Sequence, residues 1–227
     1  MYKLYIGNKN YSSWSLRPWV LMTMREIPFE ESLQVFRHAD NFEAFRQFSP
    51  SGTVPCLVDG DTVVWDSLAI VEYLAERHPG VWPQDPAARA FARSIAAEMH
   101  SGFSSLRNIC PMNCAIKVRM KALPDSLEKD LNRIDEIWQE GLQRYGGDYL
   151  AGAAFTAADA FYAPVVFRIA SYQLPVSMTS LAYCQRILGL EAVRQWDAAA
   201  IAEPWVEVAH EAEAQAAGEI IEDRRNR

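Results

Sequence analysis

The sequence predicts a small α/β domain followed by an all-α domain. Over roughly the first 80 residues, short β-rich runs alternate with segments of helical periodicity, and nearly every later segment is helical in pattern. A linker separates the two parts. It is punctuated by Pro79, Gly80, Pro83 and Pro86.

The first part has the predicted order β-α-β-α-β-β-α. The two strands 54–58 and 62–65 flank Asp59-Gly60-Asp61, which is typical of a hairpin turn. In chain order the expected elements are a strand at 3–7, a helix from 15, a strand at 29–35, a short helix at 40–48, those two strands and a helix at 67–78.

The second part is predicted to contain only helices. The expected helices are 87–106, 126–145, 156–172, 179–188 and 190–202. The charged tail at 219–227 is expected to fray.

Composition narrows the possible function classes. Half of the 227 residues are hydrophobic and 22% are charged, which excludes a disordered chain. The net charge of −7 is spread along the chain, which argues against binding nucleic acid through its phosphates. No apolar run reaches the ~20 residues that span a bilayer, and the N-terminus lacks the apolar core of a signal peptide. We therefore expect a cytoplasmic protein with no membrane contact.

The four cysteines form no C-x-x-C pair, and no histidine lies near them at the spacing of metal ligands. They are Cys56, Cys110, Cys114 and Cys184. We expect reduced, mostly buried thiols and no metal site.

A serine-rich motif, Tyr11-Ser12-Ser13-Trp14-Ser15-Leu16-Arg17-Pro18, lies between the first strand and the first helix. A hydroxyl donor next to a helix N-terminus favours the thiolate form of a nearby thiol. Lowering a thiol pKa from ~8.5 by ~1.5–2 units takes about 2–3 kcal/mol, which these two effects supply together. The alternative is that Ser12 and Ser13 only cap the helix.

Three further motifs follow. Val54-Pro55 precedes a predicted strand, and Asp66-Ser67 stands at the start of a predicted helix, where serine is also a common cap. Thr156-Ala157-Ala158-Asp159 fits a capping box, a folding element that carries no chemistry.

The layout and these four motifs resemble the cytosolic, serine-type glutathione S-transferases, and the serine motif is closest to the zeta class. The resemblance covers nearly the whole chain. It implies a thioredoxin-like domain at 1–82 that binds glutathione, and an all-helical domain at 87–227 that forms the pocket for the second substrate. It also implies a homodimer.

The resemblance also assigns roles to residues. Ser12 would assist the glutathione thiol, with Ser13 as its neighbour. Val54, before a cis Pro55, would pair with the cysteinyl backbone of glutathione. Asp66 and Ser67 would hold the γ-glutamyl ammonium and carboxylate, although zeta enzymes commonly have glutamine at the place of Asp66. His38 lies near the expected contact with the glycyl end, and the alternative is a surface histidine.

The second-substrate pocket is expected along the first long helix of the helical domain, at Met99, His100, Phe103 and Arg107. Met and Phe in such a stripe are usually core, whereas the two polar residues would meet a carboxylate. In maleylacetoacetate isomerase, a zeta enzyme, an arginine after the capping box binds the substrate's carboxylate. That place falls near Ser171 here, and the nearest arginine is Arg168.

The expected function is therefore transfer of glutathione, as co-substrate, to a small apolar electrophile in detoxification. One alternative is a glutathione-dependent isomerase of the maleylacetoacetate type. Another is a non-catalytic binding module, although a pure scaffold has no use for the whole motif set. A cysteine-type oxidoreductase ranks last, because the stretch from Ser12 to Ser15 has no cysteine.

Overall fold

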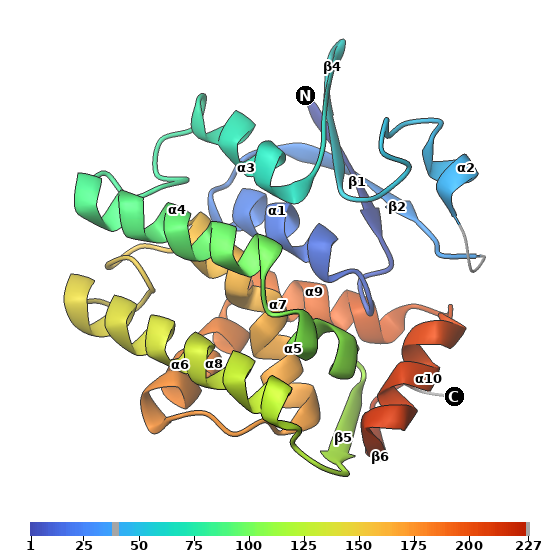
Figure 1. Ribbon diagram of the computed structural model, residues 1–227. Coiled ribbons are helices and arrows are strands. Elements are labelled where there is room, and N and C mark those ends of the chain that lie inside the picture. Colours follow the sequence, from blue (N-terminus) through green and yellow to red (C-terminus); the bar gives the residue numbers. More distant parts are fainter. Residues whose placement is uncertain (38–40, 226–227) are drawn as a thin grey trace.

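The computed structural model describes residues 1–37 and 41–225, and a four-stranded sheet occupies its N-terminal part (Figure 1). The strand order is β2-β1-β3-β4; β1 runs parallel to β2, and the other neighbouring pairs are antiparallel. The strands are β1 (Tyr2–Gly7), β2 (Phe29–Gln34), β3 (Cys56–Asp59) and β4 (Thr62–Val64). All four were predicted from sequence.

Three helices belong to this part: α1 (Ser13–Met24), α2 (Phe42–Phe45) and α3 (Ser67–Ala75). Helices α1 and α3 lie between the sheet and the later helices, whereas α2 lies apart from them (Figure 1). Most residues of α1 are buried because it packs on the sheet on one side and on the helical region on the other.

The later part of the chain is mainly helical. Its helices are α4 (Pro86–Ser101), α5 (Ser104–Ile109), α6 (Asp125–Tyr145), α7 (Ala157–Tyr172), α8 (Met178–Gly189), α9 (Glu191–Ala202) and α10 (Val208–Ala217). A thioredoxin-like α/β part followed by helices is the fold class that the sequence predicts, and the prediction is confirmed.

Helix α7 is the centre of the helical region, and nearly all of its residues are buried. The predicted capping box is present: the Thr156 amide donates to Asp159 Oδ2 at 2.9 Å. Asp159 also accepts from the Leu150 amide and the Tyr183 hydroxyl, each at 3.0 Å. Burial nevertheless raises the pKa of this carboxyl to about 6.

The prediction of one continuous helix over 87–106 is wrong, because this stretch forms two helices, α4 and α5. The chain breaks between α4 and α5, where Phe103 has a φ of 54° in the left-handed region. A Cβ on Gly102 would lie 2.7 Å from the Glu98 carbonyl oxygen, so the break needs a glycine there. The break turns α5 away from the line of α4 (Figure 1).

The prediction of a fraying tail is also wrong for the residues that the structure describes. Strand β6 (Gly218–Asp223) pairs antiparallel with β5 (Ile116–Met120) and adds a two-stranded sheet to the helical region, for which only helices were predicted. Beyond it, the Arg225 side chain is buried and ion-paired with Glu211 and Asp223. Burial and ion pairing hold this segment in place.

No helix in the described part of the chain is long and apolar enough to cross a membrane. The four cysteines are free and buried, as predicted. Burial raises the pKa of Cys110 to about 12, which makes it a poor nucleophile.

Candidate active site

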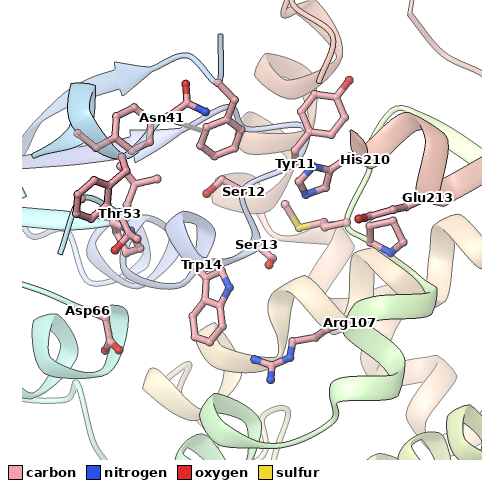
Figure 2. A pocket seen from close by; sticks show the side chains of 18 of the residues that line it. Tyr11, Ser12, Ser13, Trp14, Asn41, Thr53, Asp66, Arg107, His210 and Glu213 are labelled. Carbon is pink, nitrogen blue, oxygen red and sulfur yellow. The ribbon is translucent and has the colours of Figure 1, made fainter. Parts of the chain in front are cut away.

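A cleft of about 630 Å³ lies between the sheet-bearing part and the helical region. Figure 2 shows Ser12 near its centre, with Thr53 on one side and His210 on the other. The cleft is lined by Tyr11, Ser12, Ser13, Trp14, Phe36, Asn41, Phe42, Phe45, Gly52, Thr53, Val54, Pro55, Asp66, Arg107, Pro111, Met112, Arg168, His210 and Glu213.

Ser12 stands at the N-cap position of α1, but its side chain makes no capping hydrogen bond. Its hydroxyl instead lies 2.8 Å from the Ser15 hydroxyl, which accepts from the Gly7 amide at 3.0 Å. The backbone amide of Ser12 is bonded to the Asn8 carbonyl at 2.8 Å. The side chain is therefore held at the start of a helix without being used to cap it.

Ser13 also lies at the cleft, but its hydroxyl accepts from Arg168 Nη2 at 3.3 Å. Arg168 is 4% exposed and donates from Nε to the Cys110 carbonyl at 2.8 Å. Burial lowers the pKa of Arg168 to about 10, so it keeps its charge at neutral pH. The structure thus separates the two serines into different environments.

The Val54–Pro55 peptide bond is cis, as the motif predicts, and both residues line the cleft. Asp66 lines it from the start of α3 and is the N-cap of that helix, because its side chain accepts from the Leu68 amide at 2.9 Å. Asp66 Oδ2 also lies 3.2 Å from His100 Nε2.

Ser67 is placed differently from the prediction. It is fully buried, it does not line the cleft, and its hydroxyl accepts from Arg17 Nη1 at 3.4 Å. Arg17 is stacked between the rings of Trp14 and Phe161, at 4.1 and 4.8 Å from their centroids. Burial, with Arg168 and Arg107 nearby, lowers its pKa to about 9. Ser67 thus supports a buried arginine and is not the cap of α3.

The predicted second-substrate residues divide between core and cleft. Met99 is fully buried and Phe103 is 7% exposed, and both belong to the hydrophobic core, so their placement at the cleft was wrong. His100 does not line the cleft; its ring lies 5.3 Å from the Trp14 ring in a T-shaped arrangement, and burial lowers the pKa of His100. Only Arg107 of this group lines the cleft, with its guanidinium over the Trp14 ring. His38 lies outside the described residues.

Sequence reasoning missed the wall that α10 contributes. His210 and Glu213 project into the cleft from this helix (Figure 2). His210 Nδ1 lies 2.6 Å from Glu207 Oε2, and its ring lies 5.3 Å from the Tyr11 ring. A Glu-x-x-His pair at helical spacing was a readable signal for this element.

In the part of the chain that the structure describes, the cleft is lined by polar groups but by no thiol. Among the described residues, no cysteine lines it, and no group of three or more His, Cys, Asp or Glu side chains there is arranged to hold a metal ion. Its polar groups are hydroxyls, amides, two arginines, two carboxylates and one imidazole.

The comparisons with known proteins agree with this geometry. Residues 11–77 match the family model for the N-terminal domain of glutathione S-transferases, and residues 118–199 match the model for their C-terminal domain. The chain belongs to the glutathione S-transferase family. Both matched segments contain motifs that the sequence analysis singled out.

Among curated members of the glutathione S-transferase family, the chain is similar to a probable maleylacetoacetate isomerase of Caenorhabditis elegans. The two are 26% identical over 77% of this chain and 81% of that protein. The chain is also 32% identical to the maleylacetoacetate isomerase of Mus musculus, over 60% of this chain and 62% of the mouse protein.

Solved structures of glutathione S-transferases share the fold. One is a Burkholderia glutathione transferase homologue with bound glutathione, with a TM-score of 0.66 and 22% identity over 88% of this chain and 97% of that one. Another is a maleylacetoacetate isomerase from Methylobacterium extorquens AM1 with bound malonate and glutathione. Its TM-score is 0.64 at 23% identity, over 86% of this chain and 95% of that one.

Proposed function

We propose that this glutathione S-transferase ionises the thiol of glutathione beside Ser12 and transfers the sulfur to a small electrophile. The observation that carries the proposal is the Ser12 hydroxyl, which lines the cleft at the start of α1 and is hydrogen-bonded to the buried Ser15 hydroxyl. A thiol with a pKa near ~8.5 is only a few per cent ionised at pH 7, so a placed donor raises the reactive fraction.

The hydroxyl pair suits this role because the two hydroxyls can exchange donor and acceptor roles. Ser12 Oγ donates to Ser15 Oγ at 2.8 Å, and Ser15 Oγ also accepts from the Gly7 amide at 3.0 Å. When glutathione binds, the Ser12 hydroxyl can turn its proton to the sulfur, and Ser15 can then donate to Ser12 Oγ. The thiol proton leaves to solvent, and the amides of the first turn of α1 add a favourable dipole.

The N-terminal part supplies groups that suit the rest of glutathione, and we assign glutathione binding to residues 1–82. The Val54 backbone before the cis Pro55 suits a β-like pairing with the cysteinyl unit. The Asp66 carboxylate suits the γ-glutamyl ammonium. Residues 87–227 supply the other wall, which we assign to the second substrate.

In the transfer step, the thiolate electron pair forms a carbon–sulfur bond and the leaving group departs with the pair of the bond that breaks. No oxidant or metal is needed. Holding both reactants in one cleft converts a bimolecular encounter into a local reaction. We further propose that the protein works in the cytoplasm as a homodimer.

A second candidate, favoured by the two arginines of the wall, is isomerisation of a carboxylate-bearing substrate. Arg107 and Arg168 both line the cleft, and guanidinium groups suit carboxylates. The thiolate would add to a cis double bond, the resulting single bond would rotate, and the thiolate would leave. The named relatives include maleylacetoacetate isomerases.

The test compares Ser12→Ala with Ser13→Ala. We expect Ser12→Ala, which leaves the helix N-terminus in place, to raise the pKa of bound glutathione, followed by thiolate ultraviolet absorbance, by ~1 unit and to lower turnover with an aryl halide roughly tenfold at neutral pH. Ser13→Ala should have a much smaller effect, because that hydroxyl is bonded to Arg168.

Unchanged turnover in Ser12→Ala would overturn the assignment of Ser12. If wild type shows neither retention on glutathione resin nor a thermal shift with millimolar glutathione, the binding-module alternative is favoured. A substrate panel of aryl halides, peroxides and maleyl compounds decides between transfer and isomerisation.

A further inference from the structure

The loop that precedes Ser12 is fastened by a glutamate from the end of the helical region. Glu203, directly after α9, accepts from the Lys9 amide at 2.7 Å, the Asn10 amide at 3.4 Å and the Asn8 side-chain amide at 3.2 Å. Burial raises the pKa of Glu203, and the hydrogen bonds from Lys9 and Asn8 partly offset this effect. Because this half-buried carboxylate accepts three hydrogen bonds from one loop, it constrains the position of that loop strongly.

A second glutamate fastens the other end of this loop. Glu211 of α10 accepts from the Tyr11 hydroxyl at 2.7 Å, and the same oxygen accepts from Asn113 at 3.0 Å. Arg225 binds both oxygens of Glu211, at 2.6 and 3.0 Å. Burial alone would raise the pKa of Glu211, but the hydrogen bonds from Arg225 and Tyr11 outweigh it and lower the pKa, so the group stays ionised.

Ser12 lies directly after the residues that these two carboxylates hold. The Asn8 carbonyl accepts the amides of both Tyr11 and Ser12, so Asn8 and Tyr11 together determine where Ser12 begins α1. A donor helps a thiolate only within a narrow range of distance and angle. Small shifts of Asn8 or Tyr11 would therefore change the distance and angle between the Ser12 hydroxyl and the sulfur of bound glutathione.

We propose that Glu203 and Glu211 are positioning residues that hold Ser12 where it can donate to the thiol of glutathione. The inference rests on the proposed function of Ser12. Both glutamates lie outside the segments 11–77 and 118–199 that the family models match. The same C-terminal segment also brings His210 and Glu213 to the cleft wall, so it shapes the second-substrate side while it fixes the thiol side.

The test uses the full-length chain with three variants and one control. Glu211→Gln places an amide N–H against the donors that now meet a carboxylate. Tyr11→Phe removes the hydrogen bonds that the Tyr11 hydroxyl makes with Glu211 and Arg225 and leaves the buried Glu211–Arg225 pair in place, so it keeps the test valid if Glu211→Gln folds poorly. Glu203→Gln weakens the other anchor. Glu219→Gln is the control, because Glu219 lies on the same segment in an exposed ion pair with Arg119.

The decisive readout is the pKa of the bound glutathione thiol, measured together with kcat, KM and the unfolding midpoint. We expect each of the three variants to raise the thiol pKa and to lower kcat roughly three- to tenfold at neutral pH, with KM for glutathione little changed. The lost rate should recover above the new pKa. Glu219→Gln should match wild type.

A lowered unfolding midpoint with an unchanged thiol pKa in Tyr11→Phe and Glu203→Gln would overturn the inference, because that is the result for a purely structural anchor. Ser12→Ala, measured alongside, separates the two failures. If Ser12→Ala also leaves the thiol pKa unchanged, the proposed function of Ser12 fails. If Ser12→Ala is the only variant that raises the thiol pKa, the positioning role of Glu203 and Glu211 fails and the proposed function of Ser12 stands.

Discussion

Arg168 Nη2 donates to Ser13 Oγ at 3.3 Å, although the two residues lie 155 positions apart in the chain. This contact joins the central helix α7 to the first residue of α1. The charged guanidinium thus contacts the residue that directly follows Ser12 in the chain. A buried charge of the helical region therefore contacts the residue next to Ser12 at the start of α1.

Arg168→Lys should destabilise the protein by about 2–4 kcal/mol. A lysine ammonium cannot reproduce the planar fork that serves Ser13 and the Cys110 carbonyl, and the charge stays buried. Urea unfolding measures the effect. Arg186→Lys, in an exposed ion pair with Asp148, is the matched control and should change stability by less than about 0.5 kcal/mol. Equal effects of the two substitutions would contradict the account.

Arg107→Gln should change substrate preference. Its guanidinium lies at the cleft wall, so we expect kcat/KM for a carboxylate-bearing electrophile to fall roughly tenfold, with a neutral aryl halide little affected. Met99→Ala is the contrast. It should cost about 2–4 kcal/mol of stability, because Met99 is fully buried, without altering the ratio between the two substrates. A changed ratio in Met99→Ala would place that residue at the cleft after all.

Asp159 should make stability depend on pH. Burial raises its pKa in the folded protein to about 6, above the unfolded value of 3.8. Between about pH 4 and 6 the native carboxyl keeps a proton that the unfolded chain releases, so the free energy of unfolding falls as pH rises, by about 3 kcal/mol in total. Urea titrations across this range should show a flatter profile in Asp159→Asn. Asp148→Asn, on an exposed side chain, should keep the wild-type profile.

Gly218→Ala should loosen the C-terminal segment. A Cβ at this position would lie 2.1 Å from the Arg119 carbonyl oxygen in the β5–β6 pair, and backbone cannot move aside cheaply. We expect a loss of about 1–3 kcal/mol and faster amide hydrogen exchange in α10 and β6. Gly189→Ala, at the end of α8 with open space around it, is the control. It should be neutral or slightly stabilising.

The local motifs were readable from sequence because each carries its own short-range chemistry. The capping box at Thr156, the cis bond at Pro55 and the serine pair at 12–13 all lie where the motifs indicate. Met99 and Phe103 were misplaced because helical spacing tells which residues share a face, but not whether that face meets the core or a cleft.

The C-terminal elements α10 and β6 were not predicted from the sequence, for a different reason. Among the described residues, strand β6 carries charged side chains and pairs only with β5, about 100 residues earlier, and α10 buries a single alanine, Ala214. Strand β6 has no strong pattern of its own, and α10 has a weak one, the Glu207-x-x-His210 spacing. Their order comes from the ion pairs of Arg225 and from strand pairing, which no local window reveals.

The Tyr11–Glu211 bond spans 200 positions, and the Arg225 contact with Tyr11 spans 214. During synthesis the residues of the four-stranded sheet emerge long before α10 and β6, so the loop before Ser12 can make its contacts with Glu211 and Arg225 only after those two elements have emerged. A ribosome-bound nascent chain with a folded N-terminal part would still be catalytically immature.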